Sequence, residues 1–252
     1  MPRTRTLVCT RDVVIRLNPR TDHVARRGFS LLELLIVLSI TVVLASLLMP
    51  ALAHLRDNVH RVISASNMRQ IGLATAMYAE DNNEMLPYSE LLEQGFPEEL
   101  MASHIGSHND AWDGLGLLYN QQYCDSAEVF YSPSHHGNHP YHRYAQEWTN
   151  PSGTVRIYTN YHYGGHESWL DGHPRFLAKG EDLIVMTDGL RTKQDINHSN
   201  GLNMVHGDLS VQWHPEGQRI IEMLPKSVNG EPGPSPTPFN QIWRELPSAD
   251  AQ

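Results

Sequence analysis

Residues 26–35 read RRGFSLLELL, and this stretch decides how the rest of the chain is organised. Two arginines and a glycine stand directly before an apolar run, and one carboxylate, Glu33, lies inside it. The 22 residues from Leu34 to Leu55 include no Asp, Glu, Lys or Arg. Because an α-helix rises about 1.5 Å per residue, a helix of that length measures roughly 33 Å, enough to cross a bilayer core of about 30 Å. The stretch therefore predicts a membrane-spanning helix.

Glu33 is unusual at the edge of such a segment. A carboxylate within the membrane costs on the order of 2.5–3.5 kcal/mol on insertion scales, so we expect it to be functional and to need a partner. An amine buried at the same depth is a natural neutralising group.

These residues resemble the processing site of type IV prepilins and of type II secretion pseudopilins. The pattern of that family is a basic leader, a glycine, a phenylalanine that becomes the first residue, and a glutamate at the fifth mature position; Gly28, Phe29 and Glu33 match it. The resemblance implies that a prepilin peptidase cuts between Gly28 and Phe29 and methylates the new amino terminus. It also implies that Glu33 meets the terminal amine of a neighbouring pilin or pseudopilin subunit in an assembled fibre.

A cleaved secretory signal is the competing interpretation, because Ala51-Leu52-Ala53 offers an A-x-A site at the end of the apolar run. The long segment before the run and Glu33 within it argue against that alternative.

Charge is divided unevenly along the 252 residues. The basic leader, residues 1–28, carries a net charge of +5, which leaves −14 for the remainder of a chain whose total is −9. A basic leader is expected to stay cytoplasmic. The sequence thus predicts a single-pass protein of the bacterial inner membrane with a periplasmic head. An acidic head without a basic stripe argues against nucleic-acid binding. Cys9 would leave with the leader, so Cys124 alone cannot form an internal disulfide.

The apolar helix is expected to continue beyond the membrane. Apolar or small residues recur at three- and four-residue steps at Leu55, Val59, Val62, Ala65, Met68 and Gly72. One helix is therefore predicted for residues 29–83, transmembrane to about residue 55 and packed on a head thereafter. Pro50 should bend or locally unwind it. The resemblance implies a role in assembly for Pro50, since pilins commonly carry a proline at that position. Asp81-Asn82-Asn83 should end the helix.

The sequence after the long helix predicts an α+β, pilin-like fold, in which the helix packs on a small antiparallel sheet. Residues 84–152 form a variable, loop-rich region with short helices at Glu90–Gln94 and Trp112–Tyr119. Short β-rich segments in 153–224 predict the sheet head, at Thr154–Thr159, Asp182–Thr187, Leu202–His206, Leu209–Trp213 and Arg219–Leu224. Gly207-Asp208 reads as a hairpin turn. Residues 225–252 are predicted to form a proline-rich tail, which Ile242 and Trp243 can attach to the head.

A narrower resemblance is to the pseudopilin-like proteins abundant in planctomycetes and verrucomicrobia. Residues 77–82, MYAEDN, match a stretch that ends the first helix of those proteins. His198, nine intervening residues and Asp208 match their C-terminal motif, in which Asp-Gly usually follows the spacer; here Leu209 follows Asp208. Relatives often have Cys-Pro where this chain has Ser132-Pro133.

Two candidate metal sites have simpler alternatives. The resemblance implies a calcium ion as one candidate, since major pseudopilins carry a calcium site in their late loops. Oxygen ligands of the right kind are offered by Asp188, Asp195, Asn197 and Asp208. These residues can equally shape turns, with His198 bonded to backbone. His135, His136, His139 and His142 could hold zinc or copper, or lie in a solvated loop.

No nucleophile elbow, HExxH motif or phosphate-binding glycine loop is present, so we expect no enzyme. The primary hypothesis is a structural subunit of a type II secretion pseudopilus or a type IV pilus-like fibre. The alternative is a membrane- or fibre-displayed binding module for glycans or secreted cargo. Its contact surface would come from aromatic residues that can also form core, namely Trp112, Tyr131, Tyr141, Tyr144, Trp148, Tyr161, Tyr163 and Trp169.

Overall fold

The computed structural model describes residues 29–108, 110–168, 172–177, 183–215, 217–225 and 241–246. The chain divides into two compact units, residues 1–50 and 51–252. Helix α1 (Leu31–Asp81) contributes to both units. The leader, with Gly28 and Cys9, lies outside the described residues, and so does most of the predicted tail.

Helix α1 runs for 51 residues, close to the predicted bounds. The helix continues through Pro50, so it is not locally unwound there, and the alternative effect of Pro50, a bend, stays a prediction. The helix ends where the polar cluster predicts. Asn83 and Glu84 have left-handed φ angles of 56° and 63°, and the Glu84 N–H donates to the carbonyl of Ala79 at 2.8 Å. Two successive residues in this conformation cannot continue a right-handed helix.

Four antiparallel strands make the main sheet, in the order β3 (Tyr161–Tyr163), β4 (Ile184–Asp188), β5 (Leu202–His206) and β6 (Val211–His214). A separate pair joins β1 (Ala102–His104) to β2 (Ile157–Tyr158). The predicted α+β fold with small antiparallel sheets is therefore confirmed. Strand β5 was predicted with its observed ends, β2, β4 and β6 were predicted with shifted ends, and β1 and β3 were not predicted.

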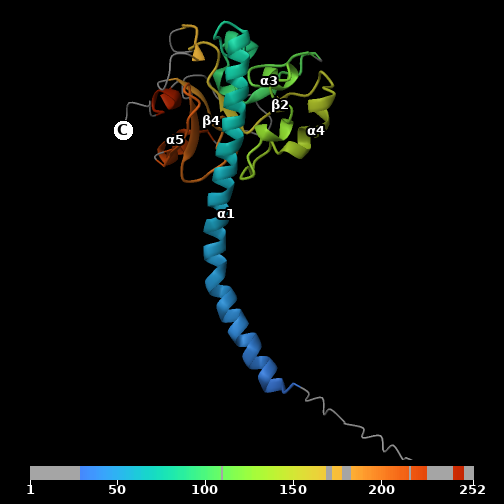
Figure 1. The fold of residues 1–252 in the computed structure, drawn as a ribbon, viewed down its shortest axis with the longest axis vertical. Coiled ribbons are helices and arrows are strands. Elements are labelled where there is room, and N and C mark those ends of the chain that lie inside the picture. Colours follow the sequence, from blue (N-terminus) through green and yellow to red (C-terminus); the bar gives the residue numbers. More distant parts are fainter. Residues whose placement is uncertain are drawn as a thin grey trace, which may run out of the picture. The chain divides into compact units, whose positions relative to one another are not determined.

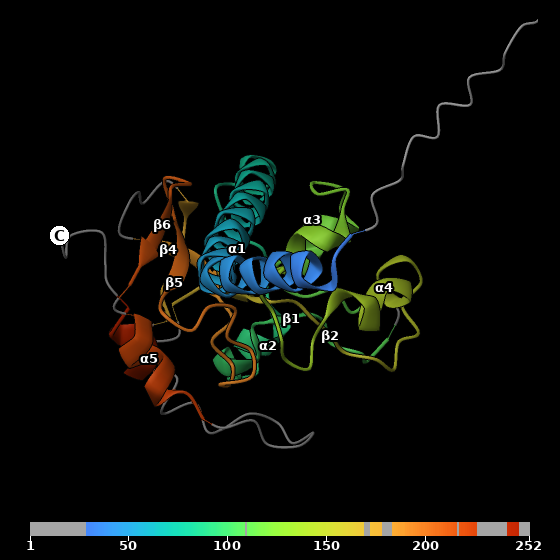
Figure 2. The same cartoon turned by 90° about the horizontal axis from the view of Figure 1, so that it is seen from below.

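The sheet is covered on both faces. On one face, Met68 and Ile71 of α1 share a core cluster with Val185 and Val205. A Cβ on Gly72 would lie 3.3 Å from Val205, so the glycine permits close approach of the helix. The other core cluster combines Leu202 and Met204 of β5 with residues from α5 and the C-terminal segment. Figures 1 and 2 both show the head portion of α1 between the sheet with α5 on one side and α3, α4 and β2 on the other.

The predicted strand at Arg219–Leu224 is wrong, because these residues belong to helix α5 (Gly217–Met223) and its end. Ile220 and Leu224 are buried at 4% and 3% exposure in the second core cluster. Their i, i+4 spacing places them on one helix face. Packing against the sheet thus overrides the β propensity of the two isoleucines. Docking of the tail is confirmed, since Ile242 is 1% exposed in the same cluster.

The loop-rich region contains more helix than the sequence predicted. Helix α2 (Glu90–Glu93) matches its prediction, and α3 (Gly116–Asn120) is shorter than its prediction. Helix α4 (Tyr141–Thr149) was missed, as were the 3₁₀ turns η1 (Pro97–Glu99) and η2 (Ala127–Phe130). Helix α4 buries Tyr144 and Trp148 at i and i+4 against the head, so tertiary contacts stabilise it.

Candidate functional site

The N-terminal motif leads directly into α1. Phe29 is 83% exposed, and Glu33 lies in the first turn of the helix. A carboxylate is favoured there by the partial positive charge of the helix N-terminus. Ser30 accepts a hydrogen bond from the Leu32 N–H at 3.3 Å, which satisfies one of the unpaired amides of the first turn. Both the expected first residue and the expected assembly residue therefore lie at the exposed start of the helix.

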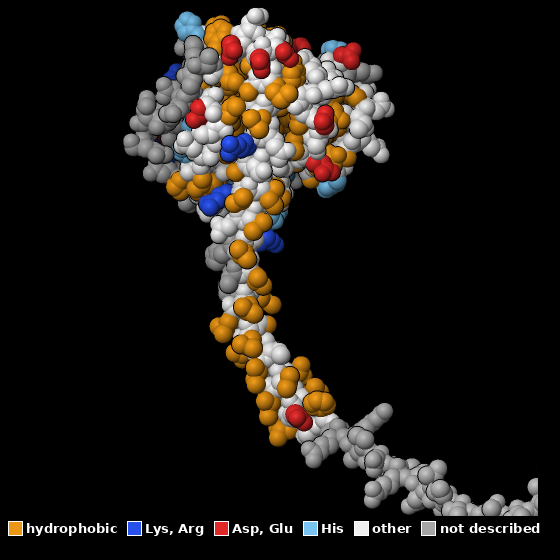
Figure 3. All heavy atoms as spheres, viewed as in Figure 1, with side chains coloured by type: hydrophobic (Ala, Val, Ile, Leu, Met, Phe, Trp, Pro, Cys, Tyr) orange, Lys and Arg blue, Asp and Glu red, His pale blue; other side chains and the backbone are white. Residues whose placement is uncertain are grey.

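Residues Leu31–Met49 are long and apolar enough to cross a membrane. None of this span is buried within the protein, and Figure 3 shows hydrophobic side chains along its visible surface. The hydroxyls of Ser39, Thr41 and Ser46 each donate to the backbone carbonyl three residues earlier, at 2.7–2.9 Å. These three hydroxyl groups are thus satisfied within the helix, as a lipid environment requires.

The two residues of the C-terminal motif have separate surroundings. His198 is 8% exposed; its Nδ1 lies 3.3 Å from the Ser134 hydroxyl and its Nε2 lies 3.9 Å from an oxygen of Asp188. Burial lowers the pKa of His198, and the Asp188 carboxylate acts in the opposite direction. Asp208 is exposed. In the described chain no hydrogen bond or ion pair joins the two motif residues, so they do not form one chemical site.

Asp208 shapes the hairpin between β5 and β6. Its carboxylate accepts a hydrogen bond from the Ser210 N–H at 2.8 Å, and this bond lowers the pKa of Asp208. The Leu209 N–H donates to the carbonyl of His206 at 2.9 Å, which closes a turn around Gly207-Asp208. Leu209 then takes a left-handed φ of 66°. A turn followed by one left-handed residue is a common bulged hairpin, and glycine is favoured at that residue. The turn geometry is therefore kept although the motif's usual glycine is a leucine.

The four proposed calcium ligands are not gathered into one site. Asp188 is fully buried, and its oxygens accept hydrogen bonds from the Asn197 amide at 2.9 Å and the Asn203 N–H at 2.6 Å. Asp195 accepts from the Thr192 hydroxyl at 2.7 Å, and Asp208 lies in the exposed hairpin. Among the described residues, the carboxylates of Asp188, Asp195 and Asp208 do not form a metal-sized cluster.

The structure does bring together one possible ligand group, formed by Glu93, His166 and Glu167 with ligand atoms within 4.8 Å of one another. The Ser89 N–H donates to His166 Nδ1 at 3.1 Å. In neutral histidine this leaves the proton on Nε2, the nitrogen that faces Glu93 at 3.6 Å. In this tautomer the Nδ1 lone pair is used by the Ser89 N–H and Nε2 carries the proton, so His166 has no free nitrogen to offer a metal.

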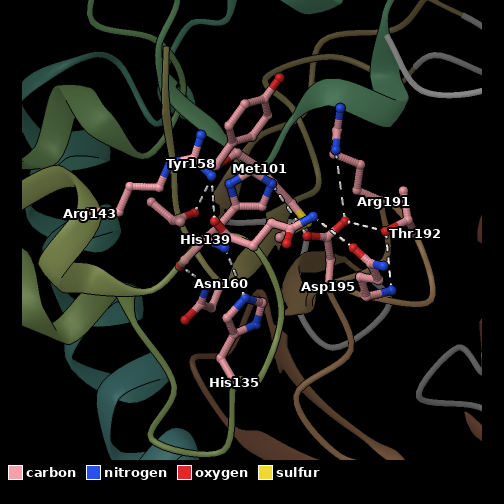
Figure 4. A network of polar contacts seen from close by, with 12 residues as sticks. Met101, His135, His139, Arg143, Tyr158, Asn160, Arg191, Thr192 and Asp195 are labelled. Atoms are coloured by element: carbon pink, nitrogen blue, oxygen red, sulfur yellow. Dashed lines mark hydrogen bonds and ion pairs between the residues drawn. The ribbon is translucent and has the colours of Figure 1, made fainter. Parts of the chain in front are cut away.

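The histidine-rich segment is not a solvated loop throughout, and His139 corrects that interpretation. His139 is 8% exposed; its Nδ1 lies 2.6 Å from the Tyr144 hydroxyl and its Nε2 lies 3.6 Å from Asp195 (Figure 4). Burial lowers the pKa of His139 to about 3 and that of His135 to about 4. Both rings are therefore neutral at physiological pH, and His136 and His142 remain exposed.

Glu99, which the sequence did not single out, anchors a buried ionic group beside His139. It is 3% exposed and accepts hydrogen bonds from the Tyr158 hydroxyl at 2.6 Å, Arg156 at 3.2 Å and Arg191 at 3.1 Å. The guanidinium of Arg191 also lies 4.8 Å from the centre of the Tyr158 ring. No sequence pattern links Glu99 to a residue 92 positions away. The group ties η1, β2 and the loop after β4 together, and we interpret it as structural.

Most of the aromatic set predicted as core or contact surface is core. Five of its eight members are buried, namely Tyr131, Tyr144, Trp148, Tyr161 and Tyr163. Trp169 lies outside the described residues. Trp112 is half-buried and lines an open cleft together with Tyr119, which sequence reasoning had not included.

Residues 24–49 match the family model described as the prokaryotic N-terminal methylation motif. The match covers the end of the leader and the apolar half of α1. No curated protein and no solved structure shows significant similarity to the chain. This motif, which spans the end of the leader and an exposed apolar helix, supports a type IV prepilin-like or pseudopilin-like protein.

Proposed function

We propose that this protein is a structural subunit of a type II secretion pseudopilus or a type IV pilus-like fibre, and not an enzyme. The observation that carries the proposal is the methylation motif at residues 24–49, which includes the exposed apolar span Leu31–Met49. Large exposed apolar surfaces are rare on soluble proteins and mark contacts with membranes or other proteins. The bilayer covers this span before assembly, and the same helix of other subunits covers it afterwards.

The basic leader supports the proposed topology. Its net charge of +5 favours the cytoplasmic side of the inner membrane, which leaves the acidic head in the periplasm. A prepilin peptidase then cuts after Gly28 and methylates Phe29. Glu33 lies four residues after Phe29, within the first turn of α1, where its carboxylate can neutralise the terminal amine of the next subunit.

Processing is tested by the intact mass and the N-terminal sequence of the protein recovered from its native membrane. We expect a chain that begins at Phe29 and is heavier by one methyl group. A chain that begins at His54 would mean ordinary signal-peptidase cleavage after Ala51-Leu52-Ala53. That result would leave an exported domain and remove the fibre proposal.

Assembly is tested with Glu33→Ala and a matched control, Glu80→Ala, which removes an exposed glutamate from the same helix. We expect Glu33→Ala to be cleaved normally and to be lost from sheared fibre fractions, because the buried amine has no counter-charge. Glu80→Ala should enter fibres as the wild type does. Normal incorporation of Glu33→Ala would contradict the assembly role.

A further inference from the structure

An open cleft of about 510 Å³ lies on the head between the segment that carries Trp112, the end of α3 and the end of α4. Its volume falls within the range of small-molecule sites, roughly 300–1,000 Å³. The cleft is remote in sequence from the processing motif, and the proposed fibre function makes no use of it.

Two half-buried aromatic rings contribute to the apolar part of the cleft. The centres of the half-buried Trp112 and Tyr119 rings are 5.8 Å apart. Trp148 lies 5.4 Å from the first ring and 4.9 Å from the second, and it is 2% exposed. Trp148 is itself fixed, since its indole N–H donates to the Tyr131 hydroxyl at 2.9 Å and it stacks on Phe130. The Trp112 and Tyr119 rings, which pack on this fixed Trp148 ring, are therefore already ordered before a ligand binds. This order lowers the entropy cost of binding.

Polar side chains surround these rings. Asp110, Asn120, Gln122, Asp125 and Asn150 all line the cleft and are exposed. Within the part of the chain that the structure describes, none of these five side chains makes a hydrogen bond. They offer carboxylate acceptors and amide groups that can both donate and accept. Among the described residues that line the cleft there is no Lys or Arg, so phosphate, sulfate or carboxylate ligands would find no counter-charge from them.

Gln122 is held in an unusual backbone conformation at this rim. Its φ is 65°, a left-handed angle that glycine usually supplies just after a helix. The Gln122 N–H donates to the carbonyl of Tyr119 at 3.1 Å, and the Tyr123 N–H donates to that of Leu118 at 2.9 Å. These two bonds are the Schellman pattern, which favours glycine at the left-handed residue. A glutamine there costs backbone energy and supplies an amide to the cleft; strained non-glycine residues are concentrated at ligand sites.

We propose that this cleft binds an uncharged oligosaccharide. A pyranose ring has an apolar face of C–H groups, and the negative face of an aromatic ring attracts such weakly positive hydrogens. Its hydroxyl groups, which project from the ring edge, need both donors and acceptors. Trp112 and Tyr119 supply the first kind of contact, and the amides and carboxylates of the rim supply the second. The open cleft admits an internal segment of a longer chain.

The test uses the full-length protein in a polyoxyethylene detergent, because detergents with sugar headgroups would compete. Cellohexaose, chitohexaose and mannohexaose are titrated by calorimetry. We expect saturable binding of at least one of them, weakened at least tenfold in Trp112→Ala. Gln122→Gly, whose backbone suits glycine, should weaken binding about two- to tenfold, the worth of one net hydrogen bond. Tyr88→Ala removes an aromatic residue that is 48% exposed outside the cleft, and it should bind as the wild type does.

Three outcomes would overturn the proposal. The first is no saturable binding of any of the three hexasaccharides. The second is equal binding by Gln122→Gly, Trp112→Ala and the wild type, which would place the ligand elsewhere. The third is binding of tetramethylammonium but of no sugar, which would mean that Asp110 and Asp125 make the cleft a cation site. None of these results bears on processing or fibre assembly, so the proposed function is tested separately.

Discussion

Asp113 should make the head less stable as the pH rises from 4 to 7. Its side chain is buried at 1% exposure beside Trp112; its oxygens accept hydrogen bonds from the Ser89 hydroxyl at 2.7 Å and the Glu90 N–H at 2.6 Å. Burial raises the pKa of Asp113 from 3.8 to about 6, although both hydrogen bonds act to lower it. The folded state therefore holds a proton that the unfolded state has already lost.

The sign and size follow from proton linkage. The folded pKa lies above the unfolded value, so the contribution to stability is complete below pH 3.8 and lost as the pH rises through about 6. A shift of roughly two units at about 1.4 kcal/mol per unit corresponds to about 3 kcal/mol. Asn at position 113 is neutral throughout. It can accept from the Glu90 N–H through its oxygen and donate to the Ser89 hydroxyl through its amide.

The assay is urea unfolding of full-length wild type and Asp113→Asn in detergent micelles, followed by tryptophan fluorescence at four pH values from 4 to 7. We expect the difference in free energy of unfolding to change by about 2.4 kcal/mol in favour of Asp113→Asn between pH 4 and pH 7, most of the full effect. Taking the difference removes contributions that the two proteins share. Asp110→Asn replaces an exposed carboxylate three positions away and should give a curve parallel to that of the wild type. A difference that stays constant to within about 0.5 kcal/mol would refute the reasoning.

Three further perturbations test other parts of the head. Gly116→Ala should destabilise it by more than about 3 kcal/mol in urea unfolding, because the new Cβ would lie 1.9 Å from the carbonyl oxygen of Ser103; wild-type stability would contradict this. His139→Gln should reduce the loss of stability on acidification. The folded pKa of His139 is about 3 against 6.5 unfolded, so the wild type loses stability as the pH falls from 6.5, by about 3 kcal/mol near pH 4; unchanged acid sensitivity would count against it. Gln122→Gly should raise the free energy of unfolding by about 1 kcal/mol by removing left-handed strain, and a loss of stability would argue against that strain.

The local features of the fold could be predicted from the sequence. The apolar run and the Asp81-Asn82-Asn83 stop give helix α1 within two residues at its start. The strand Leu202–His206 was predicted with its observed ends, because its β-rich run is bounded by turn residues. These patterns depend only on residues close together in the chain, so they can be recognised without the tertiary structure.

Features that depend on distant contacts were missed. Helix α4 has no strong capping signal; its N-cap is Pro140, without a side-chain hydrogen bond, and it is fixed by burial of Tyr144 and Trp148. The sequence of α5 alone predicts a strand, and its helical form depends on the packing of Ile220 and Leu224 in the core cluster beneath the sheet. The residues of the candidate site divide in the same way. Glu33 is found from a local motif, whereas the meeting of Trp112 and Tyr119 with the end of α4 requires the fold.

Long loops in the head need some constraint, and the structure shows no disulfide among the described residues that could supply it. Cys124 is unpaired in the structure. In place of a covalent link, the described loops are held by buried polar contacts. The hydroxyl of Ser132 lies 2.6 Å from that of Ser64 of α1, and Glu99 forms ion pairs with two arginines. A buried ionic group is strongly destabilised when one partner is removed, by about 3–5 kcal/mol. The rigidity of the loop region therefore depends on the geometry and the protonation of these contacts, whereas the rigidity that a disulfide gives does not depend on pH. The contacts can keep the Trp112 cleft in place without a disulfide.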